Sequence, residues 1–323
     1  MIRKVNIFCI LSFCLLTRLP GQSFFVPSDT LNKPRVYAAL GVTTTVGTSI
    51  ALGLYHTWYS KFEKSSFHFF NDWGEWRHMD KAGHIHTAYF QGYLTYKGAR
   101  WTGLNKKKSL LTGIICSTLF QGTVEMFDAY SAKWGFSVTD MAANLTGTSV
   151  FALQEHFWND QRIKIKISSI PKKYPNTSIS SSDGMSMSNL TIRANELFGD
   201  GLLERFLKDY NAQTYWASIN VHSMLPAENR WPGWLNIAIG YGAENLFGGF
   251  DNSWKIDGKF YSLNPNEFPR MNQFFISPDI DFTKIKTKSP FLKSLFTGLN
   301  IFKMPSPAIE FNTQGQVVFH LFK

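Results

Sequence analysis

Titratable and polar side chains recur at helical spacing between residues 80 and 144. They fall into pairs three or four positions apart: Asp80 with His84, Glu125 with Asp128, and Asp140 with Asn144. Residues at these spacings share one face of a helix. Each pair adjoins an apolar run, and an uncompensated carboxylate is costly to bury. If the helices pack together, we expect the pairs to meet in one polar cluster.

Such a cluster has the chemistry of a divalent metal site. Carboxylates with one imidazole suit Zn²⁺, Mn²⁺ or Fe²⁺, and helix bundles place such ligands on facing helices. The metal-ligand candidates are Asp80, His84, Glu125 and Asp140. The E-x-x-H and H-E-x-x-H spacings of common metal helices are absent. His86 is two positions from His84, points elsewhere on a helix, and is a poor second ligand. The sequence identifies no particular metal or cofactor, and no cofactor-binding motif.

The same residues suit acid–base chemistry without a metal. His84 beside Asp80, with Glu125 nearby, could transfer protons to a substrate such as an envelope lipid or its glycan carrier. The nucleophile motifs G-x-S-x-G and S-x-x-K are absent, and Cys116 lies within an apolar run, which predicts inert packing. The catalytic candidates are Asp80, His84, Glu125, Asp128, Asp140 and Asn144. Whether the protein is an enzyme stays open.

A structural role is the third interpretation. Asp80 and Asp140 stand where a helix N-cap would. Polar groups between packed helices also fix their register without any substrate. This interpretation predicts a binding or scaffolding module of the cell envelope, and it leaves the C-terminal region as the surface for a protein partner. The membrane-interface enzyme is its alternative.

The region around these residues, 34–162, has a helical pattern. Residues 36–59 contain no Asp, Glu, Lys or Arg and are long enough to span a bilayer. Gly113 and Ser117 have the small-xxx-small spacing that lets helices approach closely. We therefore predict a membrane-associated four-helix bundle. Its expected helices are residues 36–59, 80–100, 106–128 and 139–158.

The pattern changes after residue 162. Residues 163–189 resemble a linker, with a strand-like start and a serine-rich end at 178–188. Residues 190–323 predict one helical patch and a small antiparallel β region packed on the bundle. The helical patch is 201–210, the strands are 215–221, 234–242 and 273–282, and a hairpin covers 308–322. The predicted fold class is α+β.

The N-terminus has the features of a secretory signal peptide. Arg3 and Lys4 precede an uncharged apolar run over residues 5–17, and small and polar residues follow. Cleavage is expected near Gln22, so residues 1–22 form the signal peptide. Cys9 and Cys14 leave with it, and no intrachain disulfide is then available to Cys116.

Composition narrows the class of partner. The 323 residues carry a formal net charge of +10, but the lysines and arginines follow no nucleic-acid-binding module. We expect no nucleic-acid partner. A basic surface suits anionic lipids or other envelope components. The predicted location is the cell envelope, associated with a membrane and facing the periplasm.

The motifs resemble those of a known family. The stretch "DKAGH" at 80–84, followed by "QGTVEMFDAYSAKWGFSVTDMAANLTG" at 121–147, resembles the YfiM-type predicted periplasmic lipoproteins (domain of unknown function 2279), and more distantly the VanZ-like membrane proteins. The resemblance implies an envelope protein and supplies no reaction. Phe13 occupies a small-residue position before Cys14, so the lipid-attachment motif of the family is poorly matched. The functional positions that it implies are Asp80, Lys81, His84, Glu125, Asp128, Asp140, Asn144 and Gly147.

Overall fold

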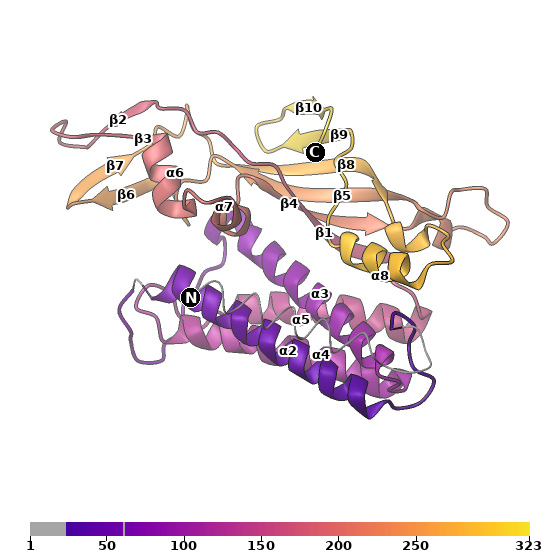
Figure 1. Ribbon diagram of the computed structural model, residues 1–323. Coiled ribbons are helices and arrows are strands. Elements are labelled where there is room, and N and C mark those ends of the chain that lie inside the picture. Colours follow the sequence, from indigo (N-terminus) through magenta and orange to yellow (C-terminus); the bar gives the residue numbers. More distant parts are fainter. Residues whose placement is uncertain (1–23, 61) are drawn as a thin grey trace.

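The computed structural model describes residues 24–60 and 62–323. Helices in the N-terminal half are followed by an antiparallel sheet, so the α+β prediction is confirmed (Figure 1). The predicted signal peptide, residues 1–22, lies outside the described residues.

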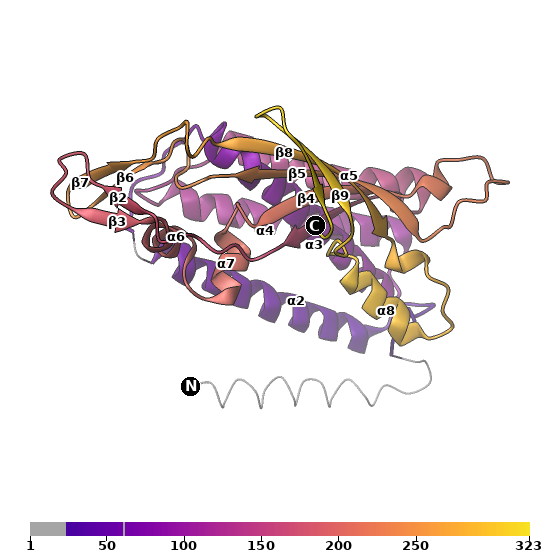
Figure 2. The same ribbon diagram turned by 90° about the horizontal axis from the view of Figure 1, so that it is seen from above.

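The bundle helices agree closely with those predicted. The second helix of the bundle, α3, packs against α4 and α5 and also contacts the sheet, while α2 runs along the outside of the bundle (Figures 1 and 2). A π-helical turn, Tyr55–Tyr59, follows α2. The helices are α2 (Lys33–Leu54), α3 (Met79–Trp101), α4 (Lys106–Ala129) and α5 (Val138–Trp158).

Among the described helices, α2 and α4 are long and apolar enough to cross a membrane. The apolar stretch of α2 is not buried in the protein, whereas that of α4 is partly buried. Leu40, Val46 and Leu52 of α2 are exposed. An exposed apolar helix of this length is compatible with the predicted membrane association.

Small residues allow the bundle helices to approach closely. A Cβ atom on Gly147 of α5 would lie 2.2 Å from the carbonyl oxygen of Ile85 on α3. Ser117 of α4 is fully buried, and its hydroxyl donates a hydrogen bond to the Ala88 carbonyl at 2.8 Å. These contacts bring the polar faces of the helices within reach of one another.

The sheet is antiparallel throughout, with strand order β1-β4-β5-β8-β9-β10 in the described residues. Ile167 of β1 and Tyr215 of β4 pack with Met79 at the start of α3. Gln154 of α5 bonds both the N–H and the C=O of Ile163. The strands are β1 (Ile163–Ser169), β4 (Gln213–Ile219), β5 (Leu235–Glu244), β8 (Met271–Ile280), β9 (Ala308–Asn312) and β10 (Val317–His320).

Several segments differ from the sequence-based expectation. The segment expected to be a linker contains β1 and a hairpin, β2 (Ser178–Ser180) with β3 (Met187–Asn189). The expected helical patch is α7 (Leu202–Lys208). Further elements that the pattern did not reveal are α6 (Leu190–Phe198), α8 (Pro290–Leu299), β6 (Ser253–Ile256) and β7 (Lys259–Ser262).

Ion pairs are buried within the β half. Lys164 lies 2.6 Å from Asp281, and Lys166 lies 2.7 Å from Asp279. Burial alone would raise the pKa of Asp281, but the charge and hydrogen bond of Lys164 lower it below its usual value. The β half therefore depends on an ionised carboxylate.

The packing at Gly147 predicts a large difference between two glycine substitutions. Gly147→Ala forces the new methyl group against the Ile85 backbone, which should cost about 1–3 kcal/mol of stability. A Cβ on Gly122 of α4 meets no atom within 4 Å, so Gly122→Ala should be neutral or stabilise by about 0.5–1 kcal/mol. Thermal unfolding of both variants measures the difference. Equal effects would contradict this helix packing.

The buried pairs predict acid sensitivity. The folded-state pKa of Asp281 is below its unfolded value, so its stabilisation is present above about pH 4 and is lost as the pH falls toward the folded pKa. Asp281→Asn should cost about 3–5 kcal/mol at pH 7 and flatten the acid limb of the stability curve. The control is Asp160→Asn, whose pair with Lys284 is partly exposed; it should cost about 0–1 kcal/mol. An acid limb in Asp281→Asn protein as steep as that of the wild type would contradict this assignment.

Candidate functional site

A buried lysine lies at the centre of the site. The Nζ atom of Lys81 lies 2.7 Å from Asp72, 2.9 Å from Asp80 and 2.8 Å from Asp140. The side chain of Lys81 is 8% exposed. These contacts join the loop before α3, the first turn of α3 and the first turn of α5.

Hydroxyl groups complete the surroundings of Asp72. The hydroxyl of Ser137 donates to Asp72 Oδ1 at 2.7 Å, and that of Thr139 donates to the same atom at 2.5 Å. Burial alone would raise the pKa of Asp72, but hydrogen bonds, including that from Lys81, lower it below its usual value. Asp72 is therefore ionised.

The helix-capping explanation does not account for either aspartate. Ser137 is the N-cap of α5, and its side chain accepts a hydrogen bond from the Asp140 N–H. His78 is the N-cap residue of α3, and Asp80 follows within the first turn. The carboxylates of Asp80 and Asp140 face Lys81 instead.

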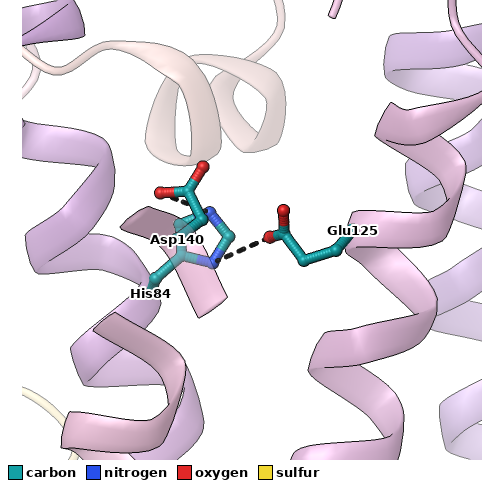
Figure 3. Close-up of side chains that lie close together, drawn as sticks. All are labelled: His84, Glu125 and Asp140. Carbon is teal, nitrogen blue, oxygen red and sulfur yellow. Dashed lines mark ion pairs between the residues drawn. The ribbon is translucent and has the colours of Figure 1, made fainter. Parts of the chain in front are cut away.

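His84 joins three helices in the next turn of α3. Its Nδ1 atom lies 3.0 Å from Asn144 Oδ1. The same atom lies 3.8 Å from Glu125 Oε1, and Nε2 lies 3.6 Å from Asp140 Oδ1 (Figure 3). Burial lowers the pKa of His84, although Asp80 and Asn144 act in the opposite direction. A neutral ring that donates from Nδ1 to Asn144 leaves Nε2 free to accept a proton or bind a cation.

Glu125 is the unusual member of this group. Its side chain is 0% exposed, and neither carboxylate oxygen has a hydrogen-bond partner at normal geometry among the described residues. Burial raises its pKa to about 8, with Asp128 adding to the shift and the Ser137 backbone opposing it. Such a carboxylate binds a proton or a cation at neutral pH.

Two groups of possible metal-ligand residues lie close together, and Asp140 belongs to both. The ligand atoms of His84, Glu125 and Asp140 lie within 4.8 Å of one another, an arrangement that could hold a metal ion. The oxygens of Asp72, Asp80 and Asp140 are equally close, but there the ammonium of Lys81 already supplies a cation.

Asp128 is not among these grouped ligand residues, and it lines a cavity. The cavity has a volume of about 340 Å³ between the bundle and the region of α6 and α7, and Asp80, His84 and Asp140 also line it. Burial raises the pKa of Asp128 to about 7, while a hydrogen bond with Tyr59 opposes the shift. His86 faces away and contacts the Ile165 carbonyl.

Sequence reasoning missed other groups of the site. Asp72 belongs to the loop before α3, Glu75 begins the short 3-10 helix Glu75–His78 that leads into α3, and Tyr59 belongs to the turn after α2. Burial raises the pKa of Glu75 to about 7, with Asp80 and Asp72 adding to the shift. The helical spacing that identified the other residues does not extend to loops. A carboxylate within the aromatic loop at 67–76 was the available signal for Asp72.

The site lies within the part of the chain that is similar to a known family. Residues 68–156 match a family model described as predicted periplasmic lipoprotein (DUF2279). The match includes Lys81 with its three carboxylates and the His84 group. It is consistent with an exported protein of the cell envelope, as predicted. No curated protein and no solved structure matches the chain.

The central position of Lys81 predicts strong destabilisation when it is removed. Lys81→Met strands the carboxylates of Asp72, Asp80 and Asp140 without their cation, at a cost of about 3–5 kcal/mol. Lys133→Met is the matched control because Lys133 lines the same cavity, is exposed, and contacts the rings of Phe62 and Trp134. It should cost no more than about 1 kcal/mol. Denaturant unfolding of both variants tests the difference, and similar losses would contradict the central role of Lys81.

Proposed function

We propose that this chain is a cell-envelope binding protein whose helix bundle holds a divalent metal ion at His84, Glu125 and Asp140. The observation that carries the proposal is the carboxylate of Glu125. It is fully buried, has no hydrogen-bond partner at normal geometry for either oxygen among the described residues, and faces an imidazole. A metal ion would satisfy these oxygens and offset their charge.

The charge balance supports a cation in addition to Lys81. The carboxylates of Asp72, Asp80, Asp128 and Asp140 share this part of the bundle with Glu125, and Lys81 contacts three of them. Without protons or another cation, the negative charge exceeds the positive charge of Lys81. A divalent ion would reduce that surplus in a poorly solvated region, where charge is most costly.

The donor set also indicates which ions would bind. One imidazole with carboxylate oxygens suits Zn²⁺, Mn²⁺ or Fe²⁺. These ligands suit soft ions, which prefer thiolates, less well. Asn144 would orient the His84 ring through its amide oxygen, as partners of metal-bound histidines commonly do. The adjacent cavity gives a polar ligand access to His84 and Asp140.

The proposed location of the protein is the cell envelope, associated with a membrane and facing the periplasm. The exposed apolar surface of α2 supports contact with lipid. We also propose that the chain is related to the YfiM-type lipoproteins and, more distantly, to the VanZ-like proteins. The β half would then have a binding or scaffolding role.

A second candidate is acid–base catalysis on an envelope lipid or glycan carrier. It is favoured by one observation: His84 and Asp80 line the cavity, so an imidazole of lowered pKa is open to a ligand. In this alternative, Glu125 and Asp140 carry protons and no metal is required.

Metal binding distinguishes these candidates. Purified protein dialysed against Zn²⁺ or Mn²⁺ should retain about one ion per chain, and a hundredfold excess over Kd should stabilise it by about 2.7 kcal/mol. Glu125→Gln should lose both effects yet keep or gain stability without metal, because it removes a buried unpaired carboxylate. Metal content by mass spectrometry and thermal unfolding provide the readouts.

Asp128→Asn is the matched control, since it removes a carboxylate from the same helix but not from the proposed metal ligands. It should retain the ion and the stabilisation. Wild-type protein without bound metal, or Glu125→Gln protein with undiminished metal, would contradict the proposal.

A further inference from the structure

A second cavity lies at another part of the molecule and has the opposite charge. Its volume is about 530 Å³, and it is formed by α3 and residues 283–297. Its described lining residues include no carboxylate. Its lysines are Lys97, Lys284, Lys286 and Lys293.

Most of this positive charge is not neutralised within the described residues. Lys284 pairs with Asp160 at 2.7 Å. Lys97 lies 5.3 Å from the centre of the Tyr93 ring, and Lys286 and Lys293 are exposed, with no ion pair in the described part of the chain. Glu155, which is not a lining residue, also interacts with the charge of Lys97. The cavity therefore has a surplus of positive charge that would favour an anion.

The helix beside this cavity has an exposed apolar side. Phe291, Leu295 and Leu299 of α8 are exposed, while Lys293 of the same helix lines the cavity. Phe291 also contacts Phe25 in the segment that leads into α2. Figures 1 and 2 place α8 at the end of the bundle where α2 begins. Basic residues beside an exposed apolar helix face are typical of helices that lie in a membrane interface.

We propose that this lysine cavity binds the phosphate of an anionic phospholipid, with the apolar side chains of α8 against its acyl chains. Phosphate is the chemistry that the lysines recognise. The lipid source is favoured over free phosphate because α8, which supplies Lys293 to the cavity, also exposes Phe291, Leu295 and Leu299, and free phosphate would leave them exposed to water. The site is independent of the metal proposed in the bundle.

Lipid binding by the full-length protein tests this site. Phosphatidylglycerol, phosphatidylcholine or inorganic phosphate is added to protein in neutral detergent micelles, and bound molecules are counted by native mass spectrometry. Wild-type protein should bind phosphatidylglycerol in preference to the other two. The double variant Lys286→Gln/Lys293→Gln should bind it about 10- to 30-fold more weakly.

A second double variant removes the same charge elsewhere. Lys173 and Lys255 are exposed and lie outside the cavity, so Lys173→Gln/Lys255→Gln should bind phosphatidylglycerol like the wild type. Leu295→Ser should weaken phosphatidylglycerol binding and leave phosphate binding unchanged. Equal losses in the two double variants would overturn the proposal, since general surface charge would then explain the binding. Inorganic phosphate that binds as tightly as the lipid would also overturn it.

Discussion

The structure of the bundle depends on the ammonium group of Lys81. Burial lowers its pKa, but the carboxylates of Asp72, Asp80 and Asp140 more than reverse that shift, so Lys81 stays charged. A buried charge is tolerated only when its partners are complete. Because those partners come from a loop, from α3 and from α5, the pairing fixes where the three segments begin relative to one another.

The same arrangement supports the proposal of a second cation. Lys81 offsets part of the negative charge, and the carboxylate of Glu125, on α4, has no hydrogen-bond partner at normal geometry among the described residues. Gly147 allows α5 to approach α3 closely enough for Asn144 to reach His84. The packing thus places the imidazole of His84, oriented by the amide of Asn144, beside carboxylates that carry excess negative charge.

Much of this could be predicted from the sequence. The bundle helices follow from long apolar runs, and the spacing of Asp80 with His84 and of Asp140 with Asn144 predicted that their side chains would meet. Asp72 was missed because the position of its loop is set by tertiary contact with Lys81. Ser289 and Pro290 are a helix-start signal in the sequence, but the apolar run that follows them was too short to indicate the helix α8. The serine-rich stretch at 178–188 resembled a linker by composition, yet strand pairing orders it.

The proposed metal site of the bundle consists of His84, Glu125 and Asp140. X-ray absorption at the metal edge of protein loaded with Zn²⁺ tests it most directly. The expected ligands are one imidazole nitrogen together with carboxylate oxygens, at about 2.0–2.2 Å from the metal. A spectrum without histidine scattering, or one that is unchanged in His84→Ala protein, would contradict it.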